Sequence, residues 1–118
     1  MAGFSRDERI RRRSDYQQVY DRGLKIHGRL FTLFVLPTDL PRGRLGIAAT
    51  RKFGGAVQRN KAKRLIREVF RRNKPVGGFD IVVVPKRNVL DASLTALESE
   101  FRQILSRSLR RAGTAPRV

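Results

Sequence analysis

Residues 51–74 read RKFGGAVQRNKAKRLIREVFRRNK, and this stretch decides the fold of the chain. From about Ala56 to Arg72, apolar residues recur at the spacing of one helical face. They are Ala62, Leu65, Ile66, Val69 and Phe70. We therefore expect a long helix that packs on the rest of the protein through this apolar stripe.

The opposite face of the predicted helix carries cations. At about 100° per residue it lies roughly 180° from the apolar stripe, and its members are Asn60, Lys63, Arg64, Arg67 and Arg71. Arg59, Lys61 and Arg72 lie on the flanks, and Glu68 is the only acid of the stretch. A solvated helix usually mixes charges of both signs four residues apart. This face therefore indicates a polyanionic partner.

The chain as a whole is strongly basic. Its 118 residues contain 27 Lys and Arg against 10 Asp and Glu, a formal net charge of +17. A soluble surface needs only a few net charges, whereas a large positive excess favours association with phosphates. We infer a nucleic acid as the partner rather than an anionic membrane. The length fits one domain around a single core.

The sequence excludes several other classes of protein. It contains no Cys, so neither a disulfide nor a thiolate metal site can form. No apolar run approaches the roughly 20 residues of a membrane span, and the N-terminus lacks the apolar block of a signal peptide. We expect a cytoplasmic protein with no membrane contact.

A basic arm and a short helix are predicted at the start of the chain. The arm occupies residues 1–13, where arginines surround a single isoleucine. Ser14 and Gln17 form the capping box of the helix, and Gly23 lies just past its end. A helix of this length is marginal alone and must dock on something.

Four strands and a last helix complete the predicted order. Apolar β-branched or alternating residues predict strands at residues 24–27, 30–36, 45–50 and 79–85. The last helix, capped by Ser93 or Asp91, extends through Leu109 before a flexible tail at residues 112–118. The order predicts a small two-layer α+β domain at residues 14–111.

Tyr16, Val19 and Tyr20 share one face of the short helix. Two interpretations of the tyrosines stay open. They are core residues, or they line a groove in which single-stranded bases stack on their rings.

The strands and the turn before the basic helix leave further choices open. Residues 30–36 are apolar on both faces, so helices cover both sides of the sheet or one face binds a ligand. In the third strand, Gly46, Ala48 and Thr50 form a small face that suits a closely packed helix or a shallow groove. The Phe53–Gly55 turn either lets backbone N–H groups approach an anion or is only a flexible connection.

The side chains offer no catalytic group. The acids are scattered, and no pair reads as the carboxylates of a two-metal nuclease. His27 is the only histidine and has no neighbouring carboxylate, so we expect it at a strand or surface position. No Ser or Thr has a base beside it. We therefore expect an RNA- or DNA-binding protein rather than a self-sufficient catalyst.

The basic stretch resembles the protein subunit of bacterial ribonuclease P. That family carries Lys-x-Gly-x-Ala-Val-x-Arg-Asn-Arg-x-Lys-Arg-x-x-Arg after a strand. The corresponding run here is KFGGAVQRNKAKRLIR, from Lys52 to Arg67. The likeness extends over about Glu8–Arg111 and includes DYQQVYDRG at residues 15–23 and RLFTLFVL at residues 29–36.

The resemblance implies a fold and a function. The fold is α-β-β-β-α-β-α, like the second domain of ribosomal protein S5, with a mixed sheet and a left-handed crossover at the basic helix. The general rule for parallel strands alone would give a right-handed crossover. The implied function is removal of the 5′ leader from precursor tRNA, with hydrolysis by the RNA subunit and its Mg²⁺. The implied partners are the catalytic RNA and the leader, with no obligate protein partner and no metal held tightly by the protein.

Carried over by position, the resemblance implies two groups of binding residues. Those that meet the catalytic RNA are Arg59, Asn60, Lys61, Lys63, Arg64 and Arg67, to which we add Lys52 and Arg71 of the same basic stretch. Those that line the leader groove are Tyr16, Tyr20 and Phe34, with Lys86 and Arg87 near its rim. Metal positions are left open.

Three residues depart from the family pattern. Lys61 stands where Arg is common, which keeps the charge but loses the bidentate fork. Tyr16 and Tyr20 are often Phe in the family, so stacking survives and the hydroxyls add a possible contact to phosphate or water.

Two other functions are weighed against this one. A ribosomal or general RNA-binding protein without a ribozyme partner fits the size and charge equally well. A protein-only nuclease is disfavoured, because the chain has no carboxylate cluster.

Overall fold

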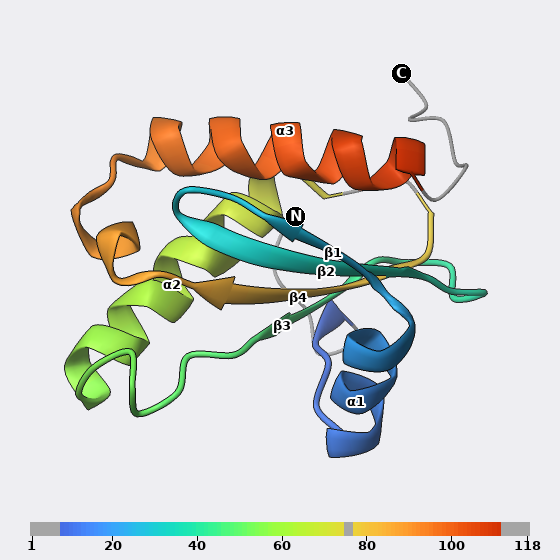
Figure 1. Cartoon of the computed structure of the whole chain (residues 1–118), viewed down its shortest axis with the longest axis horizontal. Helices are drawn as coiled ribbons and strands as arrows, with labels where there is room; N and C mark the ends of the chain where they lie inside the picture. The colour runs from blue at the N-terminus through green and yellow to red at the C-terminus, as the bar shows by residue number, and fades with distance from the viewer. Residues whose placement is uncertain (1–7, 75–76, 112–118) are drawn as a thin grey trace.

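The computed structural model describes residues 8–74 and 77–111. The α-helices and strands follow the predicted order, and a 3₁₀ helix that was not predicted lies between the last strand and the last helix (Figure 1). The elements are α1 Arg13–Arg22, β1 Leu24–His27, β2 Phe31–Pro37, β3 Arg44–Ile47, α2 Ala56–Arg72, β4 Phe79–Pro85, the 3₁₀ helix η2 Arg87–Asp91 and α3 Leu94–Arg111. Residues 1–7 of the predicted arm, loop positions 75–76 and the predicted tail at 112–118 lie outside the described residues.

The four strands form one mixed sheet in the order β1-β2-β4-β3. β2 pairs antiparallel with β1 and β4, whereas β3 pairs parallel with β4, to which α2 connects it. Figure 1 shows α3 and α1 on opposite sides of this sheet. The bounds predicted for α2 and β4 are confirmed, and so is the α+β class.

The main core lies between one face of the sheet and the helices α2 and α3. From α2 come the buried residues of the predicted stripe, Ala62, Ile66, Val69 and Phe70, with Leu65 packed at the edge. From α3 come Leu97, Phe101, Ile104 and Leu105. The strands contribute, among others, Phe31, Leu33, Val35, Ile81 and Val83. The predicted orientation of the α2 stripe is confirmed.

A smaller cluster lies on the other face of the sheet, under α1. Its buried members are Ile10, Val19 and Val82. Figure 1 shows α1 over one end of the sheet only. The helix pair α2 and α3 is thus the second layer of the predicted two-layer plan, and α1 adds a partial third.

Residues 8–10 of the predicted arm lie along the edge of β3. Ile10 is buried, and its N–H donates to Leu45 O at 2.9 Å, beside a parallel bridge between Arg9 and Leu45. Glu8 is buried next to Lys74, with 2.7 Å between its Oε2 and the lysine Nζ. This part of the arm therefore belongs to the folded domain and covers an open strand edge.

The predicted cap of α1 is wrong. Arg12, not Ser14, is the N-cap residue, and no side chain caps this end. Gln17 does not reach back to the cap, because its Nε2 donates to Asp21 Oδ1 at 3.0 Å. Gly23 follows the helix as predicted, in extended rather than left-handed backbone.

The predicted end of β3 is also wrong, since the strand stops at Ile47 rather than at residue 50. Ile47 pairs with Val83, and Ala48 N–H still donates to Val83 O at 2.9 Å, so the next bond of the parallel ladder would need the N–H of Pro85. Proline has no N–H to donate to a neighbouring strand, and the ladder ends there. The cap of α3 is Ser93, whose Oγ accepts from Ala96 N–H at 3.1 Å.

α3 also holds the turn between β1 and β2. Glu100 Oε1 accepts from Arg29 N–H at 3.0 Å, and its Oε2 accepts from Leu30 and Phe31 N–H at 2.6 and 3.3 Å. Asn88 Nδ2 donates to Arg29 O at 3.0 Å. These contacts satisfy backbone groups that the turn leaves outside the strand ladder.

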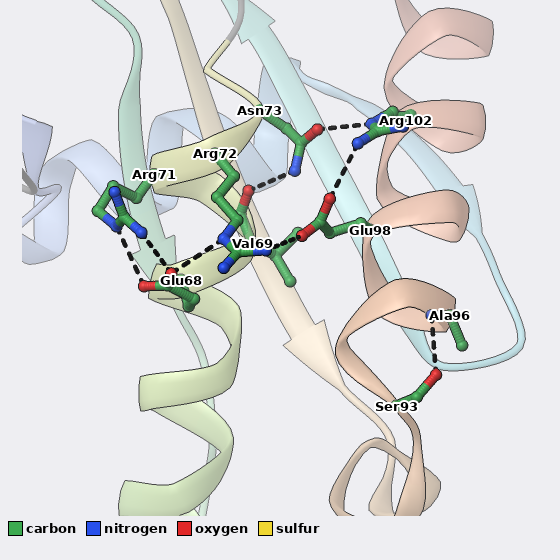
Figure 2. A network of polar contacts seen from close by, with 9 residues as sticks. All are labelled: Glu68, Val69, Arg71, Arg72, Asn73, Ser93, Ala96, Glu98 and Arg102. Atoms are coloured by element: carbon green, nitrogen blue, oxygen red, sulfur yellow. Dashed lines mark hydrogen bonds and ion pairs between the residues drawn. The ribbon is translucent and has the colours of Figure 1, made fainter. Parts of the chain in front are cut away.

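Polar contacts join the C-terminal end of α2 to α3 (Figure 2). Arg72 Nη1 donates to Glu98 Oε1 at 3.1 Å. Arg102 donates to Glu98 Oε2 at 2.9 Å and to Asn73 Oδ1 at 2.6 Å. Asn73 Nδ2 in turn donates to Val69 O at 2.8 Å. The orientation of α2 is thereby fixed at its last turn.

We predict that Ile66→Ala destabilises the domain by about 2–5 kcal/mol, because it leaves a cavity between α2 and the sheet. Ile66 is 2% exposed. Val57→Ala on the same helix is the matched control, since Val57 is 83% exposed and such surface changes stay within about 0.5 kcal/mol. Urea unfolding followed by circular dichroism measures both. Equal destabilisation by the two variants would contradict the packing of the stripe.

Candidate nucleic-acid interface

The floor of the candidate site is a row of residues that crosses the whole sheet. The strand register aligns Lys25 with Phe34, Phe34 with Val82, and Val82 with Gly46. Val82 belongs to the cluster under α1, and side chains that share a row in paired strands share a face. α1 therefore lies over a floor to which all four strands contribute.

α1 places its two tyrosines over different parts of this floor. A Cβ at residue 46 would lie 2.7 Å from Cε1 of Tyr16 and 2.8 Å from its Cζ and Oη, so the ring rests on Gly46. Tyr20 contacts Phe34 edge to face, with ring centroids 5.0 Å apart at 82°. Val19, between the tyrosines in sequence, is fully buried. The small face of β3 thus packs closely against a helix, α1.

Tyr16, Tyr20 and Phe34 form what we call the aromatic surface. The two tyrosine rings have centroids 6.4 Å apart, and Lys25 Nζ lies 5.5 Å from the centroid of Phe34. Tyr20 is 36% exposed, and the other two side chains are half-buried. Neither tyrosine is a fully buried core residue, since Val19 fills that role. Partly exposed rings in a row are suited to stacking of single-stranded bases.

Both tyrosine hydroxyls are protonated at neutral pH. Burial raises the pKa of Tyr16, and a backbone hydrogen bond from Ile47 and the positive charge of Arg67 offset part of that increase. Burial also raises the pKa of Tyr20, and the neighbouring Tyr16 adds to the effect. Each hydroxyl can therefore donate a hydrogen bond to a phosphate oxygen.

The cationic face of α2 and the loop before it form what we call the basic surface. Lys52, Asn60 and Arg64 are exposed, and Lys63 and Arg67 are half-buried. Among residues 8–74 and 77–111, none of these five side chains is paired with a carboxylate. An unneutralised row of this kind attracts phosphates.

Two other residues expected to meet RNA are engaged within the protein. Arg59 Nη1 donates to Gly54 O at 3.0 Å. Lys61 Nζ donates to Leu90 O at 3.3 Å, on the side of α2 that faces η2. Carbonyl partners leave both charges uncompensated, so both cations add to the positive potential around the basic surface.

Arg71, also expected to meet RNA, is bound to an acid instead. Its Nε donates to Glu68 Oε2 at 3.1 Å, its Nη2 donates to Oε1, and Arg72 Nε donates to Oε1 at 3.0 Å (Figure 2). The bonds from Arg71 first, and from Arg72, lower the pKa of Glu68. The like-charge repulsion expected along the helix is therefore relieved at its last turn.

The loop that precedes α2 is anchored by its own contacts. Phe53 is buried in the main core, and its O accepts from Arg87 Nη1 at 3.1 Å. Gly55 N–H donates to Gln58 Oε1 at 2.6 Å, so this N–H already has a partner. These contacts attach the loop to the core, to η2 and to the first turn of α2.

Lys86 and Arg87 lie at the far end of β4 from the aromatic surface. Val82 pairs with Phe34, and Lys86 is four residues further on, roughly 13 Å along an extended strand. Lys86 Nζ donates to Gly28 O, and Arg87 contacts the loop before α2. The structure does not bring these two cations to the tyrosines.

A small cavity of about 120 Å³ lies where the aromatic surface meets the basic surface, and we call it the junction cavity. Its lining comes from the arm, α1, β3 and α2, and consists of Arg9, Ile10, Tyr16, Leu45, Ile47, Lys63 and Arg67. The sequence did not predict Arg9 as a site residue. No periodicity links the arm to α2, and only the charge of Arg9 could have drawn attention to it.

The described part of the chain contains no group of three or more His, Cys, Asp or Glu side chains that could hold a metal ion. Many acids are committed to ion pairs, namely Glu8, Asp15, Glu68, Asp80, Glu98 and Glu100. His27 lies exposed on β1, as predicted, with Nδ1 at 3.2 Å from Thr32 Oγ1. No helix in residues 8–74 and 77–111 has the length and apolar content to cross a membrane.

The fold and the two surfaces define a class, a small and strongly basic α+β protein with a surface suited to single-stranded nucleic acid. The family model described as Ribonuclease P matches residues 4–109 of the chain. The chain belongs to the ribonuclease P protein family. It is therefore a protein component of ribonuclease P, the enzyme that matures the 5′ ends of tRNA.

Relatives and solved structures agree with this assignment. The ribonuclease P protein component of Thermotoga maritima is 44% identical over 88 residues, which cover 73% of this chain and 75% of the relative. That of Desulfovibrio desulfuricans is 41% identical over 112 residues, covering 89% and 85%. The solved structure of the Thermotoga maritima protein matches with a TM-score of 0.75 at 35% identity, covering 85% of this chain and 96% of that one.

We predict that Gly46→Ala destabilises the domain by about 1–3 kcal/mol, because the added methyl group overlaps the ring of Tyr16. Urea unfolding measures the change. In a Tyr16→Ala background the same substitution should cost less than half as much, since the ring that it displaces is gone. Equal costs in the two backgrounds would show that Tyr16 does not rest on Gly46.

Proposed function

We propose that this chain binds the catalytic RNA of ribonuclease P and the 5′ leader of precursor tRNA, while the RNA subunit carries out the hydrolysis. One observation supports this division above the others: the aromatic surface and the basic surface meet at the junction cavity. A single strand laid on such a site stacks its bases on the rings and directs its phosphates towards α2.

The leader is the natural occupant of the aromatic surface. It is single-stranded, and stacking on tyrosine or phenylalanine tolerates any base, as a leader of variable sequence requires. Lys63 and Arg67 stand beside Tyr16 in the junction cavity, where they can neutralise the phosphates of a strand stacked there. Lys86, at the other end of the same sheet, extends the proposed path.

The basic surface is the natural contact for the folded catalytic RNA. Lys52, Asn60 and Arg64 are exposed and are among the five side chains without an acidic partner. Each phosphate that such a cation neutralises releases a counterion, so binding of this kind weakens steeply with salt.

We assign Mg²⁺ to the RNA subunit rather than to this chain. The described acids do not fit a protein-held Mg²⁺ site, because they do not gather in threes and many already bond to Arg or Lys. We further place the protein in the cytoplasm with no obligate protein partner. Under this proposal its own side chains bind and orient RNA.

A ribosomal or general RNA-binding protein is the alternative function. The test compares cleavage of precursor tRNA by the protein alone, by the catalytic RNA alone at modest Mg²⁺, and by both together. We expect cleavage at the mature 5′ end to be fastest with both and absent with the protein alone. Cleavage by the protein alone would establish a protein-only nuclease. No effect of the protein on the RNA would favour the alternative.

We predict that Tyr20→Ala weakens precursor tRNA binding to the reconstituted holoenzyme by about 1–3 kcal/mol, because one stacking ring is lost. Tyr20→Phe keeps the ring and is expected to bind nearly as tightly as the parent. Mature tRNA, which has no leader, serves as the second ligand and should bind both variants equally. Equal loss for precursor and mature tRNA would remove the leader from this surface.

We predict that Arg64→Ala lowers the slope of log affinity against log salt for the catalytic RNA by up to about one unit. Arg71→Ala is the matched control on the same helix, because the parent side chain is bound to Glu68. The slope for Arg71→Ala should change less than the slope for Arg64→Ala. Filter binding at several salt concentrations measures both, and an unchanged slope for Arg64→Ala would place that residue away from phosphates.

A further inference from the structure

Arg44 joins three elements of the fold. It begins β3, and its guanidinium donates to both carboxylate oxygens of Asp80 on β4, from Nε at 2.8 Å and from Nη2 at 2.7 Å. Its Nη1 lies 3.6 Å from Asp15 Oδ2, in the first turn of α1. Asp80 is 4% exposed, so the β3–β4 contact is buried and the contact with Asp15 connects it to the helix.

The three-way contact lies beside the aromatic surface. Asp15 directly precedes Tyr16, and Arg44 comes two residues before Gly46 on the same strand face, where the ring of Tyr16 rests. Hydrogen bonding to Asp80 raises the pKa of Arg44 above its ordinary value, so the cation is permanent. A fixed charge on the sheet therefore holds the first turn of α1.

Apart from this ion pair, α1 is held by apolar packing: Val19 is buried, Tyr16 rests on Gly46, and Tyr20 contacts Phe34. No side chain caps its N-terminus, and Val19 is its only buried residue. A helix of 10 residues is not stable alone and takes its position from what it packs on. Both tyrosines are partly exposed, so their packing restrains rotation of the helix less than full burial would, and rotation would carry Tyr16 off Gly46 and Tyr20 off Phe34.

We propose that Arg44 and Asp15 are positioning residues for leader binding. Their ion pair holds α1 in the orientation at which Tyr16 and Tyr20 form the stacking surface. The inference rests on the proposed function, because it explains how the aromatic surface is kept ready for a single strand. Neither residue touches the leader, and both act through the tyrosines. A surface ordered in advance loses less entropy when the strand binds.

The test uses Asp15→Ala in the holoenzyme reconstituted with catalytic RNA. This change removes the contact with α1 and leaves the buried pair of Arg44 and Asp80 intact. We expect precursor tRNA to bind about threefold to tenfold more weakly, as a partial loss of stacking, while mature tRNA binds as before. Asp15→Glu restores the carboxylate and should recover most of the loss. Thermal unfolding of each variant confirms that it folds.

Glu98→Gln is the matched control. It weakens the ion pair with Arg72, which joins α2 to α3, and the ion pair with Arg102 within α3, and neither pair involves α1. We expect it to leave the ratio of precursor to mature tRNA affinity unchanged. A double-mutant cycle with Tyr16→Ala tests whether Asp15 acts through Tyr16. Once the ring is gone, Asp15→Ala should remove little further affinity.

Three results would overturn the positioning role: additive losses in the cycle, an equal loss for precursor and mature tRNA, or a shifted ratio in the Glu98→Gln control. The proposed function is tested separately by Tyr20→Ala. If that variant leaves leader binding intact, the part of the proposed function that places the leader on the aromatic surface fails. If it weakens leader binding and Asp15→Ala does not, only the positioning role fails.

Discussion

Burial of one face of α2 against the sheet governs the rest of the structure. Ile66 and Phe70 leave water only if the helix turns its opposite face outward, and that face holds Lys63, Arg64 and Arg67. The described acids that form ion pairs lie elsewhere, in the arm, near the last turn of α2 and on α1, β4 and α3. A row of like charges opposes compaction by self-repulsion, and a bound polyanion relieves it. Packing of the apolar stripe and attraction for RNA are therefore two results of one orientation.

Elements that show as long, unbroken patterns in the sequence were predicted correctly. Features that depend on a residue distant in sequence but close in space were missed. The bounds of α2 and β4 followed from periodicity and from a β-branched apolar run. The cap of α1 was missed because Gln17 bonds to Asp21, a choice that the spacing alone does not reveal. The end of β3 was missed because it depends on Pro85 of β4. Only the register of the two strands shows that Pro85 lies beside the end of β3.

The candidate site likewise combines features that the sequence predicted with features that it missed. Spacing placed Tyr16 and Tyr20 on one helix face, but their surroundings depend on the cross-strand row that puts Gly46 and Phe34 beneath them. Its place on the cationic face of the predicted helix assigned Arg71 to RNA, whereas the structure bonds it to an acid three residues earlier. Arg9 reaches the junction cavity only because the arm runs along the edge of β3. The meeting of four separate elements there is a property of topology, which no local pattern contains.

Through Glu100, α3 supplies hydrogen-bond acceptors to the turn between β1 and β2. The backbone N–H groups of Arg29, Leu30 and Phe31 bond to this one carboxylate, which lies 70 residues beyond Leu30 in the chain. On the ribosome, β1 and β2 emerge long before residue 100 is made, so the turn between them keeps water as its partner until then. Docking of α3 is accordingly the step that gives this turn its protein partners, and in a nascent chain shorter than 100 residues these N–H groups bond to water.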